Sequence, residues 1–255
     1  MTDPTARPPL PSFVIIGAQK SATRWMRRNL GAHPEVFAAP QEVKFFNHPK
    51  RVEQLGLDWY RKQFVGWQGE EIVGEATPGY MMWWHRPVEV AERIHRLVAD
   101  VKLIALLRDP VDRAQSALGH HIGQERIRPG TRLVDWVRRQ PPDQDWLGIV
   151  SGGWYAASLE PYIRTFGDRL LVILYDDVIA EPVTTYKRAL NHVGGSQDRV
   201  PESLSEVVGR GRSSRSLVPT LSDRDRADLY ELFAADVDRL EDLIDRDLSD
   251  WRPRP

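Results

Sequence analysis

The stretch that decides the fold of this chain is FVIIGAQKSATRW, residues 13–25. Its first four residues are apolar and mostly β-branched, which is typical of a buried strand. A loop of small and polar residues follows, and a helical pattern begins near Trp25. The loop carries Lys20 and Arg24 beside the free backbone amides of a helix N-terminus, which favour an anion. The stretch therefore predicts a strand, an anion-binding turn and a helix, with an ordinary strand-to-helix turn as the alternative.

Further apolar runs predict a parallel sheet around this first strand. Segments that read as buried strands, with 36–39 as a shorter candidate, are 13–18, 72–76, 102–108 and 170–175. Strands that alternate with helices need crossover connections, which indicate parallel pairing. The expected fold class is α/β, with a single P-loop-like domain whose central parallel β-sheet is flanked by helices. Ligands bind such sheets at the carboxyl ends of the strands, so we expect Lys20, Thr77, Arg108 and Asp176 to converge on one edge.

The helical patterns and the loops complete this outline. Helices are expected at about 22–31, 53–65, 87–99, 110–121, 131–139, 153–166 and 182–193, with a last amphipathic helix that a capping box at Ser222 opens. Residues 194–216 read as a long loop, and the Pro-rich residues 1–11 as a disordered lead-in. Residues 12–255 should then form one domain.

Composition restricts the partners and the compartment. The chain of 255 residues has 35 basic and 36 acidic side chains, a net charge of −1, so no global field draws it to nucleic acid or to a membrane surface. Any anion site must be local. There is no cysteine, which suits a reducing compartment. Because we find no signal peptide and no apolar run long enough to cross a bilayer, we expect a soluble cytoplasmic protein.

Two further basic segments are candidate phosphate sites. Arg108 ends a predicted strand, and Ser116 lies about two turns into the helix that follows. The planar guanidinium of an arginine donates two parallel hydrogen bonds to a phosphate, although Arg108 could instead pair with a nearby aspartate. Residues 209–215, GRGRSSR, combine glycines with three arginines, and a solvated flexible loop is the alternative there.

A candidate general base lies in EVKFFN, residues 42–47. Partial burial among the apolar neighbours of Glu42 would raise the pKa of its carboxyl towards that of a useful base, whereas an exposed loop glutamate is the alternative. No histidine spacing suggests a metal site, because His120 and His121 are adjacent and point about 100° apart on a helix. The clustered tryptophans read mainly as core, with MMWW at 81–84 as a candidate acceptor pocket.

The four motifs, taken in order, resemble those of the PAPS-dependent sulfotransferases, most closely the branch of heparan-sulfate sulfotransferases and their bacterial relatives. IIGAQKSATR at 15–24 is similar to the loop that holds the 5′-phosphosulfate, and LRDPVDRAQS at 107–116 to the 3′-phosphate motif. EVKFFN resembles the segment with the catalytic base, and Gly211-Arg212 the late basic loop over the nucleotide. The first loop departs from the Walker A pattern, since Gly17 is followed by Lys20 after only two residues and no glycine directly precedes Lys20.

The resemblance implies transfer of a sulfuryl group from PAPS to an acceptor hydroxyl or amine, with release of PAP and without a metal. Glu42 would take the acceptor proton, and Lys20 would neutralise charge on the leaving phosphate. Lys44 is a third expected catalytic residue. The residues expected to bind the nucleotide are Lys20, Ser21, Ala22, Thr23, Arg24, Arg108, Ser116, Arg210, Gly211 and Arg212.

Three positions depart from the resembled pattern. Ala22 stands where relatives usually have a glycine, and its side chain restricts the backbone of the loop. Lys44 stands where many relatives have a histidine. Ala76, in EATP at 75–78, replaces a second active-site lysine, and we suggest that Lys44 supplies the missing charge.

The acceptor is open between a small molecule, a glycan and a lipid-linked glycan. A long basic cleft formed by Arg126, Arg128, Arg132, Arg138 and Arg139 would favour a sulfated glycan, whereas the MMWW segment favours an apolar or aromatic acceptor. We lean towards a small metabolite or a lipid-linked glycan. The competing function classes are a kinase-like nucleotide-binding enzyme and a non-catalytic PAP- or PAPS-binding scaffold, and the sequence leaves the oligomeric state open.

Overall fold

The structure is a computed structural model of the chain, and the fold is described for residues 8–140, 144–205 and 217–253. Its five strands are β1 (Phe13–Gly17), β2 (Val36–Ala38), β3 (Ile72–Ala76), β4 (Lys102–Leu107) and β5 (Leu170–Leu174). The α-helices are α1 (Thr23–Leu30), α2 (Pro49–Arg61), α3 (Pro87–Leu97), α4 (Pro110–Gly123), α5 (Leu133–Arg139), α6 (Tyr155–Phe166), α7 (Tyr175–Ala180), α8 (Pro182–Val193), α9 (Asp223–Tyr230) and α10 (Ala234–Ile244). Short 3₁₀ turns include η1 (Pro78–Met81) and η2 (Trp83–His85).

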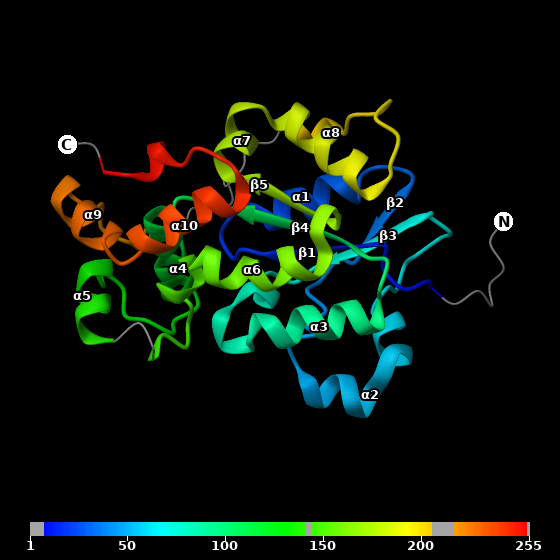
Figure 1. The fold of residues 1–255 in the computed structure, drawn as a ribbon, viewed down its shortest axis with the longest axis horizontal. Coiled ribbons are helices and arrows are strands. Elements are labelled where there is room, and N and C mark those ends of the chain that lie inside the picture. Colours follow the sequence, from blue (N-terminus) through cyan, green and yellow to red (C-terminus); the bar gives the residue numbers. More distant parts are fainter. Residues whose placement is uncertain (1–7, 141–143, 206–216, 254–255) are drawn as a thin grey trace.

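The strands form one parallel sheet in the order β2-β3-β1-β4-β5, which confirms the expected α/β class. The chain leaves β1 through α1 towards one edge of the sheet and later crosses through α3 to the other side of β1 (Figure 1). The strand order therefore reverses at β1, and ligands of open α/β sheets bind at such a point. The loop after β1 lies where the fold favours a ligand.

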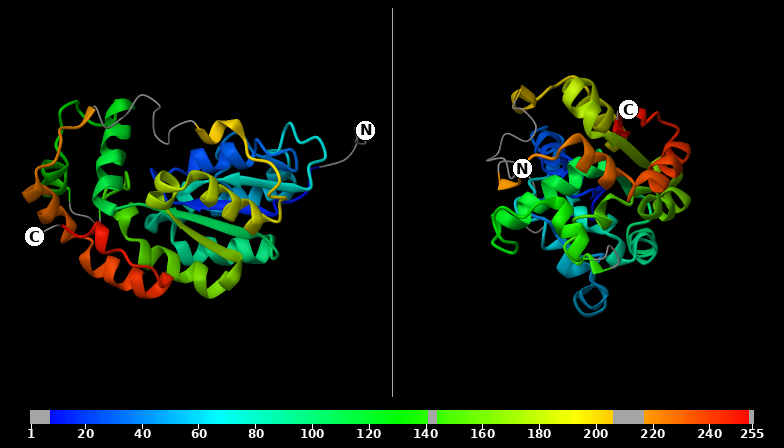
Figure 2. Two further views of the ribbon diagram at one scale, coloured as in Figure 1. Left: turned by 90° about the horizontal axis from the view of Figure 1, so that it is seen from above. Right: turned by 90° about the vertical axis from the view of Figure 1, so that its left-hand side faces the viewer.

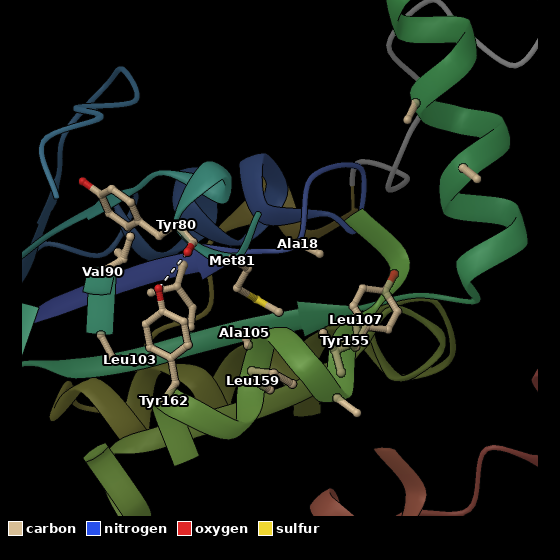
Figure 3. Close-up of a cluster of buried hydrophobic side chains, with 14 of the residues drawn as sticks. Ala18, Tyr80, Met81, Val90, Leu103, Ala105, Leu107, Tyr155, Leu159 and Tyr162 are labelled. Carbon is tan, nitrogen blue, oxygen red and sulfur yellow. Dashed lines mark hydrogen bonds between the residues drawn. The ribbon is translucent and has the colours of Figure 1, made fainter. Parts of the chain in front are cut away.

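The central strands are buried on both faces, because alternate side chains of a strand point to opposite sides. Phe13 and Ile15 pack in a cluster with α1 and α8, whereas Val14 and Ile16 pack in a second cluster with α3 and α6. Figure 3 shows part of the second cluster, in which β4 faces the side chain of Tyr162. The helices α4, α5, α9 and α10 lie beyond the carboxyl ends of the strands (Figures 1 and 2).

Local differences from the sequence expectation have simple causes. Helix α2 begins at Pro49 rather than near residue 53, because a proline at the first helical position needs no hydrogen-bond partner for its nitrogen. The single helix expected after Ser222 is two helices, α9 and α10, although the Ser222 hydroxyl accepts from the Asp225 amide at 3.1 Å as a cap does. Helix α7 had no sequence signal.

Residues 8–11 contact the rest of the fold, although they were expected to belong to a disordered lead-in. Leu10 packs against the core, and Arg61 donates to the carbonyl of Pro8 at 2.9 Å, while residues 1–7 lie outside the described part. In the described ranges no helix is long and apolar enough to cross a membrane.

Candidate functional site

The loop between β1 and α1 has the geometry of an anion-binding turn. Lys20 and Ala22 both adopt left-handed backbone conformations, with φ of 74° and 67°. No side chain caps the first turn of α1, and that turn holds no acidic residue. The first amides of the helix are therefore free to meet an anion. The alanine at position 22 takes the conformation that a glycine would take, so the geometry of the loop is kept without the glycine.

Four cationic side chains gather around this loop. Burial lowers the pKa of Lys20, and the positive charges of Arg24, Arg108 and Arg113 lower it further. Nη1 of Arg108 forms a long hydrogen bond of 3.4 Å with the carbonyl of Lys20, which joins the first loop to the end of β4. Such a concentration of like charge is unfavourable by itself and is relieved when an anion binds.

The turn between β4 and α4 holds Arg108 rigidly. Its guanidinium is buried, lies over the ring of Tyr175 at 4.5 Å and pairs with Asp112 at 3.3 Å. The Tyr155 hydroxyl donates to the Arg108 carbonyl at 2.8 Å. Ser116, on the same helix, is also buried. The pairing with Asp112 was the alternative for Arg108, yet Nε of Arg108 has no hydrogen-bond partner among the described residues.

Helix α9 supports this turn from outside. Arg226 pairs with Asp109 at 2.5 Å and with Asp112 at 2.9 Å. Asp109 caps α4 by accepting from the Asp112 amide at 2.8 Å, and burial raises the pKa of its carboxyl. Arg226 therefore shares the Asp112 carboxylate with Arg108, so that Asp112 neutralises less of the positive charge of Arg108.

Sequence reasoning missed Arg113. This side chain is fully buried, donates to the carbonyl of Ile149, and has no partner for Nε and Nη1 in the described part of the chain. Burial lowers the pKa of its guanidinium. Its position on the helix could have indicated a functional role. Arg113 shares a helical face with Pro110 and Ala117, and an arginine is rarely buried on such an apolar face unless its charge is paired or binds a ligand.

Glu42 and Lys44 form an ion pair at the mouth of the neighbouring pocket. Nζ of Lys44 lies 3.3 Å from Oε2 of Glu42, and the two side chains are 53% and 48% exposed. Glu42 is therefore the exposed loop glutamate that was the alternative to partial burial: Val43, Phe45 and Phe46 point into the core, and the two charged residues point outward. Lys44, rather than an apolar wall, is the nearest influence on the Glu42 carboxylate.

A pocket of about 280 Å³ connects this ion pair to the first loop. Its wall includes Gln19 beside Lys20, and both Glu42 and Lys44. The rest of the wall mixes aromatic, apolar, neutral polar and basic residues: Asn47, His48, Pro78, Gly79, Met82, Trp84, His85, His121, Arg126, Trp146 and Leu147. Of the arginines expected to line a basic cleft, Arg126 reaches this pocket, while Arg132 pairs with Asp225 at 2.7 Å.

The histidines near the pocket are poor proton acceptors. Burial and then the charges of His48, Arg93 and Lys44 lower the pKa of His85 to about 4. Burial and then nearby cations, Lys20 first, lower the pKa of His120 to about 4. At neutral pH these rings are uncharged, so Glu42 is the acidic side chain that the pocket wall offers as a base.

One residue expected at this edge has a structural partner, and three expected contacts to the nucleotide lie outside the described residues. Asp176 follows β5 but accepts from the Trp251 indole at 3.0 Å, on the C-terminal segment rather than beside Lys20. Arg210, Gly211 and Arg212 lie outside the described residues. Among the residues that are described, no group of three or more side chains could hold a metal ion.

Fold and site together define an α/β protein with an anion-binding turn at the switch point of a parallel sheet. A family model described as "Sulfotransferase domain" matches residues 10–210. A sulfotransferase structure from Alicyclobacillus acidocaldarius is 30% identical, covers 95% of this chain and 99% of its own, and superposes with a TM-score of 0.79. The chain therefore belongs to the sulfotransferase family.

Curated relatives lie in the heparan-sulfate branch. Mouse heparan sulfate glucosamine 3-O-sulfotransferase 3B1 is 31% identical over 188 residues, which is 72% of this chain and 46% of the relative. Human heparan sulfate glucosamine 3-O-sulfotransferase 6 is 29% identical over 185 residues, 72% of this chain and 52% of the relative. The chain spans about half the length of these curated relatives. The mouse sulfotransferase SULT7A1, solved with PAP, is 12% identical over 91% of this chain and 85% of its own, with a TM-score of 0.53, and so shares the fold.

Proposed function

We propose that this chain transfers a sulfuryl group from PAPS to an acceptor hydroxyl or amine and releases PAP. The observation that carries the proposal is the pocket in which Gln19, beside the cationic loop, shares a wall with Glu42 and Lys44. A donor anion at the loop and an acceptor in the pocket would then be neighbours. Proximity and fixed charge supply most of the acceleration in such transfers.

The donor side is assigned to the cationic loop and the β4–α4 turn. The amides of residues 21–23, with Lys20 and Arg24, would hold the 5′-phosphosulfate, and Arg108 with Ser116 the 3′-phosphate. The unpartnered, buried guanidinium nitrogens of Arg108 and Arg113 support this, because buried donors without partners are costly until an anion binds. Arg210, Gly211 and Arg212 remain proposed contacts to the nucleotide from outside the described residues.

The acceptor side is assigned to Glu42 and Lys44. The acceptor oxygen or nitrogen forms a bond to sulfur as the bond from sulfur to the bridging phosphate oxygen breaks. Glu42 takes the acceptor proton, and Lys20 stabilises the negative charge on the departing phosphate. Lys44, 3.3 Å from Glu42, orients the carboxylate through their ion pair, and it supplies the cation that Ala76 lacks.

The pocket suits a ring-shaped acceptor with an acidic substituent. Trp84 and Met82 offer flat or adaptable apolar surface, and Trp146 is 72% exposed at the wall. Arg126 and Lys44 supply positive charge there. A volume of about 280 Å³ admits a small molecule or one terminal unit of a glycan. A glycan acceptor agrees with the names of the heparan-sulfate relatives, and a free or lipid-linked sugar and a small phenol are the acceptors to compare.

The experiment is incubation with labelled PAPS and a panel of phenols, glycans and lipids, with mass spectrometry for the added sulfuryl group. Parallel samples receive EDTA, or ATP in place of PAPS. Sulfated product that is insensitive to EDTA supports the proposal. Transfer from ATP, or activity that EDTA abolishes, would indicate the kinase-like alternative, and PAP binding without any product would indicate a scaffold.

Lys44→Ala tests the catalytic assignment of Lys44. We expect kcat to fall roughly ten- to hundredfold while KM for PAPS changes by less than about threefold, because Lys44 acts on the acceptor side. Steady-state kinetics measures both constants. Lys62→Ala, an exposed lysine at the end of α2, is the matched control and should behave as wild type. Wild-type turnover in Lys44→Ala would reject the assignment.

We also propose the cytoplasm as the compartment and residues 12–255 as one functional unit. The lack of cysteine suits a reducing environment, and the matched family region extends across the whole sheet. Cell fractionation with an antibody against the chain tests the compartment.

A further inference from the structure

Glu75, on the central strand β3, carries a carboxylate that is buried completely and fully engaged. Its Oε1 accepts from the Tyr80 hydroxyl at 2.7 Å and from the Tyr60 hydroxyl at 3.1 Å. Its Oε2 accepts from the Thr77 hydroxyl at 2.6 Å. A buried carboxylate is costly unless hydrogen bonds compensate it, so a sequence without need of one would place an apolar residue here.

Two of these three hydroxyls also form hydrogen bonds with the segment that carries the proposed catalytic pair, Glu42 and Lys44. Thr77 Oγ1 accepts from the Lys44 amide at 3.1 Å, and Tyr80 Oη accepts from the Phe45 amide at 3.1 Å. A backbone amide can only donate, so each hydroxyl accepts from its amide and directs its own proton to a Glu75 oxygen. Glu75 thereby holds both hydroxyls that bind the amides of residues 44–45.

The segment that these bonds hold needs such support. Lys44 has φ of 53°, a left-handed conformation that is unfavourable for a lysine and persists only when neighbouring contacts fix it. Arg51 contributes from the other side, donating to the Lys44 carbonyl at 2.9 Å and to the Val43 carbonyl at 3.2 Å. Tyr80 is itself fixed, because Tyr162 donates to its carbonyl at 2.7 Å (Figure 3).

We infer that Glu75 is a positioning residue for the transfer reaction. Through the Thr77 and Tyr80 hydroxyls it holds the turn that presents Glu42 and Lys44 to the pocket. The inference rests on the proposed function, since it assigns Glu75 a role through Glu42. The third hydroxyl, that of Tyr60, binds Glu75 without a hydrogen bond to the turn and so provides an internal control.

The test compares Thr77→Val with Tyr60→Phe, each of which removes one hydroxyl from Glu75 and keeps the side-chain shape. We expect Thr77→Val to lower kcat roughly ten- to hundredfold, because small displacements of reacting groups are costly. KM for PAPS should stay within about twofold of wild type. Both substitutions should lower the melting temperature by similar amounts, since each removes one hydrogen bond to Glu75. Tyr60→Phe, however, should change kcat by less than about twofold.

Two more variants keep the test decisive. Thr77→Ser restores the hydroxyl and should restore most of kcat, and Tyr80→Phe should lower kcat as Thr77→Val does. PAP binding, measured by calorimetry, shows that each variant is folded. The inference is overturned if Thr77→Val retains wild-type kcat, or if Tyr60→Phe loses as much kcat as Thr77→Val. Failure of the proposed function itself is distinct, because the wild-type protein would then transfer nothing.

Discussion

Ala22 adopts a left-handed backbone conformation at a position of the loop where relatives usually have a glycine. Its left-handed backbone costs an L-residue roughly 1–2 kcal/mol, whereas a glycine would add roughly 0.4–1 kcal/mol of unfolded-state entropy. We therefore expect Ala22→Gly to stabilise the chain by up to about 1 kcal/mol, or roughly 2–4 °C in melting temperature. Differential scanning calorimetry measures the shift.

The control for this loop is an alanine with ordinary helical geometry. Ala227→Gly, inside α9, should destabilise the protein by about 0.5–1 kcal/mol. If Ala22→Gly lowers the melting temperature as Ala227→Gly does, the strain assigned to the loop is absent.

His85 gives the chain a predictable response to acid. Its pKa lies at about 4 in the fold and near its ordinary 6.5 in the unfolded chain, so between these values the unfolded state binds a proton that the folded state does not. Stability therefore falls as the pH drops from 6.5 towards 4. His85→Gln should make the dependence of unfolding free energy on pH shallower over this window, by at most about one proton. Urea unfolding at several pH values measures it, and an unchanged slope would refute the assignment.

At the scale of elements, α9 and α4 are joined by an ionic cluster beside the proposed phosphate site. Removing Arg226 leaves Asp109 buried with one partner fewer, and it takes from Asp112 one of the cations that share this carboxylate with Arg108. We expect Arg226→Ala to lower the unfolding free energy by about 1–3 kcal/mol. PAP affinity should fall as well, because Asp112 then competes more strongly for Arg108. Chemical denaturation and calorimetry measure the two effects.

An exposed ion pair elsewhere in the protein provides the control for the Arg226 substitution. Arg239 pairs with Glu160 where both side chains are about half exposed, so Arg239→Ala should cost less than about 1 kcal/mol and leave PAP affinity unchanged. Equal effects of the two substitutions would show that the Arg226 cluster has no special connection to the site.

Elements were predictable where a local pattern sufficed. The β-branched runs predicted the strands of the sheet, and Asp109 followed by Pro110 marked the start of α4. Helix α7 was missed because it is short and follows β5 directly. The break between α9 and α10 was missed because residues 231–233, which separate the two helices, include no glycine or proline to mark it.

At the scale of the molecule, the sequence predicted which segments form the site but not how they are connected. Lys20 and Arg108 were expected at one edge because both follow parallel strands, and their hydrogen bond is consistent with that expectation. Glu75 gave no signal: Thr77 and Tyr80 follow it closely in the chain but Tyr60 comes from α2, and the tertiary fold brings the three hydroxyls to one buried carboxylate. Partial burial and exposure of Glu42 were both open from the sequence, because residues that neighbour a side chain in sequence can point away from it.

The proposed function requires a donor bound at the cationic loop and a general base, Glu42, in the adjacent pocket. The most direct test is Glu42→Gln against wild type, with labelled sulfuryl transfer from PAPS to the acceptor panel and PAP affinity measured together. We expect wild type to transfer the label, and Glu42→Gln to bind PAP equally well but to transfer at least about a hundredfold more slowly. Equal transfer by the two proteins, or PAP binding by wild type with no transfer to any acceptor, would contradict it.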